Sequence, residues 1–477
     1  MDRININLET VLDMLRSGTG LRTHSGAVCP GDVFVALAGT RVDGARFIDD
    51  AVARGARVVV HGPGADISRV GDALCLEAQS PAQTLGVLAR AACGTESRLP
   101  AIVGITGTNG KTTTAHLTHF LLSQEMATGL IGTVSCTWPG VDEPATMTTP
   151  DCLTLHGIVG RMTGDGVQAV VMEVSSHALD QERTAGLPVD VGVFTNLTQD
   201  HLDYHGDMER YFEAKARLFL DGLARCARGL VNIDDEYGRR LKTLRPDLLA
   251  FGLDSEDAEL RCEVTDAGIW GMRLRISHGA DTWQLGTALV GRHNAYNLLA
   301  AVGTGLLMGL GPDQCACLSR AAGAPGRLER VPSERDLHVF IDYAHTPDAL
   351  EKVSVALKSM GFARLITVFG CGGDRDASKR PLMGQAVARH ADIVVVTSDN
   401  PRTENPDSII DQIEPGLAGA RKVLREADRR KAIALAIGCM EPKDALLIAG
   451  KGHEDYQIIG TEKFHFSDFE VVRECLT

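Results

Sequence analysis

One segment of the sequence combines glycines, a lysine and a threonine at a spacing suited to phosphate binding. Gly107-Thr-Asn-Gly-Lys-Thr112 follows an apolar run at 102–105 and precedes a helix-like run at 112–124. In a strand, loop and helix of this kind, backbone N–H groups converge on phosphate oxygens, the lysine adds positive charge and the threonine hydroxyl can ligate Mg²⁺. The standard spacing would place a glycine where this sequence has Ile105. The context still predicts a site for a nucleoside triphosphate.

Two further segments place ionisable side chains at or after the ends of apolar runs. Glu173 lies near the end of the run 167–174, and the run 189–195 is followed by a polar turn, 196–205, that contains His201. Ligands of α/β proteins bind at the carboxyl ends of the strands, and a buried carboxylate is costly unless it meets a cation. We therefore expect Glu173 to hold a nucleotide-bound Mg²⁺, with His201 on the metal side of the site.

The stretch 211–219 has the pattern of a helix whose aromatic and leucine residues face a core. On this pattern Lys215 and Arg217 lie on other faces of the helix. Since lysines are rarely buried, sequence physics alone predicts that Lys215 is a solvated surface residue.

The elements that must position these residues follow from the apolar runs. Runs that are continuous rather than alternating are typical of parallel strands covered on both faces, so the expected fold class is α/β. The expected strands are 33–37, 58–60, 102–105, 167–174, 189–195, 339–342, 365–369, 393–397 and 445–449. A polar segment at 93–100 and a glycine-rich one at 323–326, after a helix-like stretch at 294–310, indicate linkers. We predict three domains, 1–97, 98–325 and 326–477.

Length and composition agree with this division. The chain has 477 residues, whereas a single core stops growing near roughly 250–300 residues. With 44% hydrophobic and 23% charged residues it is globular, which excludes disorder, collagen and coiled coil. The balance of 48 Lys+Arg against 62 Asp+Glu gives a net charge of −14, which argues against a general binder of nucleic acid or anionic membranes.

The N-terminal residues lack a basic start followed by an apolar run, and no apolar stretch reaches the length of a membrane span. We therefore expect a cytoplasmic, monomeric protein without membrane insertion. The 12 cysteines are scattered and never spaced C-x-x-C, so we expect reduced, mostly buried thiols rather than a zinc site or a disulfide framework.

Taken in order, the motifs of nearly the whole chain resemble those of the ATP-dependent Mur ligases of peptidoglycan synthesis. Beyond the phosphate loop, the resemblance rests on Thr148–Pro150, Met172–His177, Asn196–His201, Tyr211–Phe219, Gly291–Asn297, Gly326–Glu329, Asp342–Pro347, Cys371–Asp376, Asp399–Arg402 and Ala449–Glu454. The missing loop glycine is the normal form in that family. The resemblance implies an N-terminal domain that holds the UDP end of the substrate, a central ATPase domain with a mainly parallel sheet, and a C-terminal Rossmann-like domain that receives an amino acid.

The resemblance also implies a reaction and roles within it. ATP phosphorylates a substrate carboxylate, and an amine then attacks the acyl phosphate. The implied ATP-binding residues are Gly107, Thr108, Asn109, Gly110, Lys111, Thr112, Thr113, Asn294, Asn297, Arg327, Asp342 and His345. The implied Mg²⁺ ligands are Thr112, Glu173, His201 and Lys215, and the implied catalytic residues are Lys111, Glu173, His201 and Lys215. In this family the lysine is carboxylated by CO₂ to a carbamate, so the resemblance reverses the surface role given to Lys215 above.

For the nucleotide-sugar substrate, UDP-N-acetylmuramoyl-L-alanyl-D-glutamate, the family pattern maps onto Ser25, Thr148, Thr149, Ser175, Gln181 and Arg183. An arginine is well suited to a carboxylate. The segments 23–26 and 39–44 depart from the family's usual Asp-Ser-Arg and His-Gln-Ala-Asp-Gly forms, and Met147 replaces a frequent asparagine.

The incoming amino acid is implied to be meso-diaminopimelate, which has a carboxylate and an ammonium at its far end. Two arginines can fork that carboxylate and an acidic residue can take the ammonium. Lysine-adding relatives typically lack the arginine of the Asp399–Arg402 motif. The residues implied to bind diaminopimelate are Arg375, Asp399, Asn400, Pro401, Arg402, Gly450 and Glu454.

Two alternatives stay open on the sequence. The first is another ligase of the same fold, such as a folylpolyglutamate synthase or a different Mur ligase. The second is a non-catalytic paralogue that senses UDP-muramyl peptide, which the altered N-terminal motifs suggest. A GTPase is disfavoured because no Asn-Lys-x-Asp motif is present, and a dehydrogenase because no G-x-G-x-x-G opens a strand–helix unit.

Overall fold

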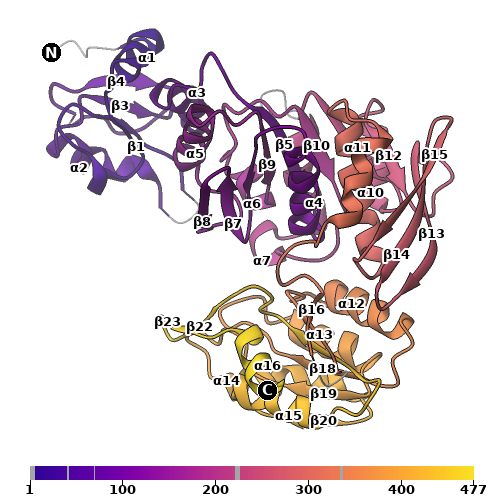
Figure 1. Cartoon of the computed structure of the whole chain (residues 1–477). Helices are drawn as coiled ribbons and strands as arrows, with labels where there is room; N and C mark the ends of the chain where they lie inside the picture. Colours follow the sequence, from indigo (N-terminus) through magenta and orange to yellow (C-terminus); the bar gives the residue numbers. More distant parts are fainter. Residues whose placement is uncertain (1–5, 40–41, 69, 221–225, 334–336, 477) are drawn as a thin grey trace.

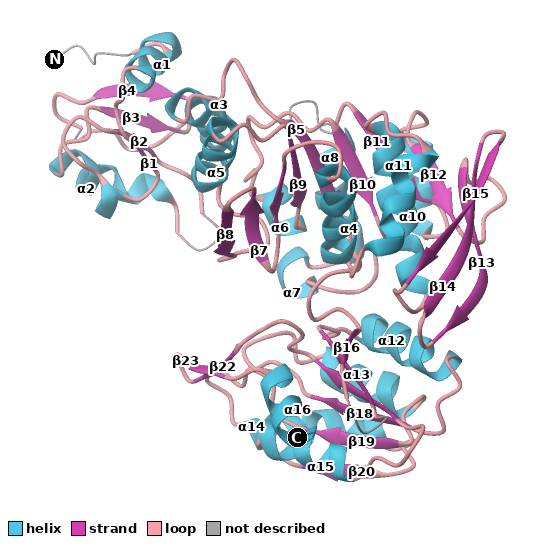
Figure 2. Ribbon diagram, in the orientation of Figure 1, coloured by secondary structure: helices cyan, strands magenta, loops and turns pink. Residues whose placement is uncertain are grey.

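The computed structural model describes residues 6–39, 42–68, 70–220, 226–333 and 337–476. Three sheets follow one another along the chain, and helices cover both faces of each (Figure 1, Figure 2). The C-terminal unit, yellow in Figure 1, lies beneath the central one. The expected α/β class is confirmed.

The N-terminal sheet has the order β1-β2-β3-β4, with all neighbours parallel. Its strands are β1 (Leu21–Arg22), β2 (Val33–Val35), β3 (Val58–His61) and β4 (Leu74–Glu77). Its helices are α1 (Leu8–Arg16), α2 (Ile48–Ala53) and α3 (Pro81–Ala92). β2 and β3 are buried throughout, because α1 and α3 pack on one face and α2 packs on the other.

The central sheet has the order β15-β14-β13-β12-β11-β10-β5-β9-β6-β7-β8. Neighbours are parallel from β13 to β6 and antiparallel beyond both. The strands are β5 (Ala101–Thr106), β6 (Thr128–Ile131), β7 (Ser135–Trp138), β8 (Val141–Pro144), β9 (Ala169–Glu173), β10 (Val191–Phe194), β11 (Arg228–Asn232), β12 (Leu249–Gly252), β13 (Leu260–Gly268), β14 (Gly271–His278) and β15 (Asp281–Thr287). The chain order reverses about β5, so the ends of β5, β9 and β10 form the crevice in which such sheets bind ligands.

Helices sandwich the central sheet. α4 (Lys111–Ser123) and α10 (Arg292–Leu307) cover one face. α5 (Cys152–Gly164), α8 (Met208–Leu220) and α9 (Glu236–Leu244) contribute to the core on the other. Three short helices are α6 (Ser176–Asp180), α7 (Leu202–His205) and α11 (Pro312–Cys315). α4 starts at the phosphate loop, so its N-terminus points positive partial charge at the crevice.

The C-terminal sheet has the order β16-β17-β21-β18-β19-β20 and is parallel except for β16. Its strands are β16 (Glu329–Val331), β17 (His338–Asp342), β18 (Leu365–Phe369), β19 (Ile393–Val396), β20 (Val423–Arg425) and β21 (Ala445–Ala449), followed by the hairpin β22 (Tyr456–Ile459) and β23 (Glu462–His465). α12 (Pro347–Ser359), α13 (Lys379–Ala388) and α14 (Pro406–Ile413) cover one face; α15 (Arg429–Gly438) and α16 (Asp468–Leu476) cover the other.

All of the strands expected from continuous apolar runs are present within a few residues. The antiparallel additions β7, β8 and β13–β15 were not predicted, because their buried and exposed residues partly alternate. The cysteines all lie in the described ranges, where they are free thiols and mostly buried, as expected. Within the described residues, no helix is long and apolar enough to cross a membrane.

Candidate active site

The phosphate loop joins β5 to α4 and is held against the end of β10. Gly107 and Gly110 have φ of 149° and 88°, where a side chain would be strained. A Cβ on Gly107 would overlap the Thr195 hydroxyl, and one on Gly110 would lie 2.5 Å from Asn297 Oδ1. The Thr195 hydroxyl in turn donates to the Asn109 carbonyl at 2.7 Å. The loop is therefore fixed before any ligand binds, as phosphate recognition requires.

Two lysines, Lys111 partly buried and Lys215 fully buried, point at this loop. Lys111 Nζ donates to the carbonyls of Gly107 and Thr108, both at 2.9 Å. Lys215 Nζ, on α8, donates to the Gly107 carbonyl at 2.8 Å. Burial lowers the pKa of Lys111, and it lowers that of Lys215 well below the ordinary value, with Lys111 adding repulsion. The loop thus has an amine beside it that favours the neutral form.

The prediction from the helix pattern that Lys215 is solvated was wrong, since Lys215 is only 1% exposed. The reason is visible in the spacing, because position 215 lies four residues after Tyr211 and three after Phe212 and so shares their buried face. Lys215 Nζ lies 4.8 Å from the centre of the Tyr211 ring. Arg217 is partly buried and pairs with Glu182 at 2.8 Å.

Glu173 ends β9 beside the start of α4 and is 1% exposed. Its Oε2 accepts from the Thr112 hydroxyl at 2.9 Å, and its two oxygens accept from the Thr133 amide and hydroxyl at 2.7 and 3.1 Å. A hydroxyl and a carboxylate side by side at a phosphate loop are the hard oxygen donors that Mg²⁺ prefers. Thr112 and Glu173 therefore fit the predicted magnesium ligands.

His201 follows β10 with a left-handed backbone, φ 54°, which is uncommon for a residue with a side chain. Burial lowers its pKa to about 3, so the imidazole is neutral and available as a metal ligand. Its ring lies 6.1 Å from that of Tyr211, the ring that Lys215 also approaches. Among the described residues no three His, Cys, Asp or Glu side chains gather as a metal site. The predicted set instead mixes hydroxyl, carboxylate, imidazole and amine groups.

Residues beyond the 323–326 segment reach the phosphate loop. Arg327 Nη2 donates to the Thr112 hydroxyl at 3.0 Å, and Asn109 Nδ2 donates to Asp348 at 2.7 Å. Asp348 was missed from the sequence, although it directly follows the Asp342–Pro347 motif. The structure therefore places part of the C-terminal unit against the nucleotide loop.

The other predicted ATP residues hold mainly internal contacts. Asn297 Nδ2 donates to Asn294 Oδ1 at 3.0 Å, and both are buried next to the loop. Asp342 accepts from the amides of Leu328 and Ala344 at 2.5 and 2.7 Å, and burial raises its pKa. Burial lowers the pKa of His345. Their roles toward adenine, ribose and phosphate stay predictions.

All but Ser25 of the residues predicted to bind the acceptor peptide lie in one cluster near Glu173. The Thr149 hydroxyl donates to the Glu173 carbonyl at 2.9 Å and accepts from the Ser175 amide at 3.0 Å. Arg183 donates to the Thr149 carbonyl at 2.9 Å and to Gln181 Oε1 at 2.8 and 3.1 Å. The guanidinium is thus held beside Thr149, and its planar fork suits a carboxylate.

Thr148 also belongs to this cluster. Its hydroxyl lies 3.1 Å from that of Thr133, which donates hydrogen bonds to the Glu173 carboxylate. Ser25 lies apart, in the N-terminal unit, where it hydrogen-bonds Asp50. Of the altered motif at 39–44, Thr40 and Arg41 lie outside the described residues.

The predicted amino-acid pocket lies on three loops, at the ends of β18, β19 and β21. Asn400 Nδ2 donates to Glu454 Oε2 at 3.0 Å, and Lys451 Nζ pairs with the same oxygen at 2.9 Å. Arg402 donates to the Gly373 carbonyl at 2.9 Å from a left-handed backbone, φ 52°. Lys451 was not predicted, and its complete burial is what marks it as Glu454's internal partner.

The loop that carries Arg375 faces Arg402. A Cβ on Gly372 would lie 3.1 Å from Arg402 Nη1 and 3.6 Å from Arg375 Cγ, so both arginines lie on the same side of this glycine. Arg380, buried and unpredicted, braces this loop through Gly372 and Glu404. Asp399 lies beside Gly450 and accepts from the Asn400 amide at 2.7 Å.

Comparison with known proteins gives matches along most of the chain. Residues 19–91 match the Mur ligase family catalytic domain, 105–305 the Mur ligase middle domain, and 326–452 the Mur ligase glutamate ligase domain. The chain is 47% identical over 453 residues to the UDP-N-acetylmuramoyl-L-alanyl-D-glutamate–2,6-diaminopimelate ligase of Lawsonia intracellularis, covering 94% of this chain and 93% of that protein.

Solved structures give the same picture. One of a UDP-N-acetylmuramoyl-L-alanyl-D-glutamate–2,6-diaminopimelate ligase is 31% identical, with a TM-score of 0.68, and the match covers 96% of this chain and 94% of that one. MurF ligase from Thermotoga maritima in complex with ADP is 20% identical, with a TM-score of 0.62 and coverage of 97% and 98%. The second likeness bears on the fold alone.

Proposed function

The chain belongs to the Mur ligase family, and we propose that it is a ligase of the MurE type. It adds meso-diaminopimelate to the D-glutamate carboxylate of UDP-N-acetylmuramoyl-L-alanyl-D-glutamate in peptidoglycan synthesis, using ATP. The observation that carries this proposal is the contact of Lys215 Nζ with the Gly107 carbonyl at 2.8 Å. It sets an amine of lowered pKa directly against the phosphate loop.

The phosphate loop binds the β- and γ-phosphates of ATP through its amides and Lys111. Thr112 and Glu173 would hold one Mg²⁺, and His201 and modified Lys215 a second, which would neutralise charge as the phosphoryl group moves. Arg327, already in contact with Thr112, is placed to stabilise the same phosphates. Arg183 and Thr149 orient the acceptor carboxylate, which takes the γ-phosphoryl group and releases ADP. The incoming amine then attacks the acyl phosphate, an amide bond forms and inorganic phosphate leaves.

Lys215 acts as a carbamate in this scheme. Its neutral amine attacks CO₂, one N–C bond forms and one proton leaves to solvent, so a base becomes an anion. A lysine of ordinary pKa would be protonated near neutral pH and could not react in this way. The lowered pKa of Lys215 supports the proposal, because burial keeps the lone pair available.

The C-terminal pocket selects the amino acid. Arg402 and Arg375 lie on the same side of Gly372 and fork the distal carboxylate, while Glu454 takes the distal ammonium. We assign substrate binding to residues 1–97, ATP chemistry to 98–325 and amino-acid binding to 326–477. In this division the acceptor reaches Lys215 from the N-terminal side and diaminopimelate reaches it from the C-terminal side.

The test is phosphate release with ATP, Mg²⁺ and the UDP-muramyl dipeptide, with meso-diaminopimelate compared against L-lysine. We expect release that requires the acceptor and that strongly favours diaminopimelate. Equal use of lysine would contradict the roles given to Arg402 and Arg375. No release with either amino acid would contradict the ligase and favour the sensor.

A further inference from the structure

The segment between α6 and β10 carries two of the acceptor-binding residues, Gln181 and Arg183. Between them, Glu182 has φ of 53°, a left-handed conformation that a residue with a side chain adopts only when its surroundings hold it there. Its side chain is directed away from the acceptor cluster, toward α3 and α8. Something other than substrate therefore holds Glu182.

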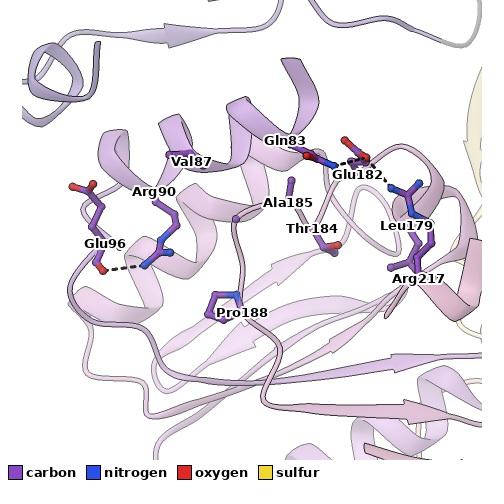
Figure 3. Close-up of a pocket in the computed structure, with 11 residues that line it drawn as sticks. Gln83, Val87, Arg90, Glu96, Leu179, Glu182, Thr184, Ala185, Pro188 and Arg217 are labelled. Atoms are coloured by element: carbon purple, nitrogen blue, oxygen red, sulfur yellow. Dashed lines mark hydrogen bonds and ion pairs between the residues drawn. The ribbon is translucent and has the colours of Figure 1, made fainter. Parts of the chain in front are cut away.

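The Glu182 carboxylate is bound by three side chains from two parts of the chain. Arg217 Nη2 pairs with Oε1 at 2.8 Å and Gln83 Nε2 donates to Oε1 at 3.3 Å (Figure 3). Ser80 Oγ donates to Oε2 at 3.2 Å. The side chains of Arg217 and Glu182 are 28% and 19% exposed, so water screens their ion pair less than it would a surface pair.

These partners connect Glu182 to both sides of the acceptor site. Ser80 caps the N-terminus of α3 in the N-terminal unit. Arg217 lies on α8 two residues after Lys215, and its Nη1 also donates to the Asp180 carbonyl at 3.2 Å. The carboxylate thus joins the substrate-side helix, the acceptor loop and the helix that carries Lys215.

The same loop is packed too closely to take up a shift elsewhere. Gly186 and Gly86 approach backbone to backbone, and a Cβ on Gly86 would lie 2.5 Å from the Ala185 carbonyl oxygen. Beside this contact, Glu182 and Arg217 line a cavity of about 400 Å³ between α3 and the loop. The backbone N–H groups of Gln181 and Arg183 donate to carbonyls of α6 at 2.9 and 2.8 Å, and the Glu182 ion pair ties the residue between them to α8.

We propose that Glu182 and Arg217 form a positioning pair that sets Gln181 and Arg183 at a fixed distance from Lys215. The pair contacts neither ATP nor the amino acid and acts only through the acceptor loop. This inference rests on the proposed function, because it requires that Arg183 bind the acceptor carboxylate. The proposal predicts that the Glu182–Arg217 pair controls the KM of the acceptor substrate and the position of the acceptor's carboxylate for phosphoryl transfer.

The experiment is steady-state kinetics of the full chain with Glu182→Gln, Arg217→Gln and the double variant. Loss of one charge-assisted hydrogen bond at a positioning site should raise the acceptor's KM about tenfold and leave the KM values of ATP and diaminopimelate within about twofold. The double variant should be no worse than either single variant, since both remove the same interaction.

Two further variants separate positioning from folding. Glu182→Gly suits the left-handed backbone, so it should keep the wild-type thermal midpoint yet raise the acceptor's KM as Glu182→Gln does. Arg90→Gln is the matched control, because Arg90 lines the same cavity but donates to the Glu96 carbonyl, away from the acceptor loop. It should keep wild-type kinetics.

Equal effects on all three KM values, additive losses in the double variant, or unchanged kinetics in Glu182→Gly would overturn the positioning pair while wild-type ligase activity stands. A wild-type enzyme that neither turns over nor binds the UDP-muramyl dipeptide in a calorimetric titration would overturn the proposed function, and this inference with it.

Discussion

The phosphate loop and the amino-acid pocket both bury charged side chains, but they satisfy those charges in different ways. At the phosphate loop, Lys111 and Lys215 donate to backbone carbonyls, and burial lowers the pKa of both. In the pocket, buried Lys451 meets Glu454 at 2.9 Å and buried Arg380 meets Glu404 at 2.8 Å. One region holds its basic groups on backbone carbonyls, where a ligand can reach them, and the other pairs its cations with carboxylates.

This difference follows from the two tasks. A site that binds a triphosphate and modifies an amine needs buried basic groups that gain from an incoming anion. A pocket that recognises a zwitterionic amino acid needs fixed geometry, and internal ion pairs hold Asn400, Glu454 and the 371–376 loop in place. Substitutions at the loop should therefore cost turnover, whereas those in the pocket should cost selectivity.

The largest effect is expected from Lys215→Ala. Turnover should fall by about a thousandfold or more because a metal-holding anion next to the transferred phosphoryl group is lost. ATP affinity, measured by calorimetry, should change only a few fold. Bicarbonate or chloride should not restore the wild-type rate, and Lys215→Arg, which keeps a long basic side chain but cannot form the carbamate, should be equally impaired. Near-wild-type turnover would remove Lys215 from the mechanism.

Arg402→Ala should act on the opposite side of the comparison. Losing a bidentate carboxylate partner should lower kcat/KM for diaminopimelate about a hundredfold and leave the KM of ATP unchanged. Arg421→Ala, which removes an exposed arginine of the same unit, is the control and should be silent. If Arg402→Ala raised the KM of ATP as strongly as that of diaminopimelate, the two regions would not be separable.

The third expected effect is on stability against pH. Since the pKa of Lys215 is lowered in the folded chain, the unfolded chain binds more protons between that value and the ordinary one, and the free energy of unfolding rises with pH across this window. In CO₂-free buffer, Lys215→Met should lose this contribution. Its thermal midpoint should exceed that of the wild type more at pH about 7 than at about 9. An unchanging difference would show that Lys215 is not held neutral.

The smallest effect is expected from Glu404→Gln. Arg380 lowers the pKa of Glu404 to about 2. The pair's contribution to the free energy of unfolding is therefore present above the ordinary carboxyl pKa and is lost as the pH falls toward 2. The variant leaves Arg380 buried without its carboxylate and should raise the KM of diaminopimelate about fivefold, with turnover retained. A large loss of turnover instead would contradict the claim that substitutions in the pocket affect selectivity rather than turnover.

Much of the fold could be predicted, because parallel strands such as 102–105 and 445–449 are continuous apolar runs in the sequence. The β13–β15 extension could not, since its partly alternating pattern lacks that signal. Site residues that lie on a single loop, such as Gly107–Thr112, could be predicted from the local sequence alone.

Contacts between distant segments could not be predicted from the residues alone. The burial of Lys215 was missed because a lysine was assumed to lie outside the apolar face of its helix. Its spacing of four residues from Tyr211 nevertheless places it on that face. The partners Asp348 and Arg217 could be recognised only when the fold brings them to Asn109 and Glu182.

The most direct test of the central claim is ¹³C NMR of the protein equilibrated with ¹³C-labelled bicarbonate. The claim is that burial keeps Lys215 as a neutral amine that takes up CO₂. It predicts a carbamate resonance in the wild type that Lys215→Ala removes and that Lys242→Ala, at a partly exposed lysine, retains. A wild-type spectrum without a carbamate signal, or one that survives in Lys215→Ala, would contradict it.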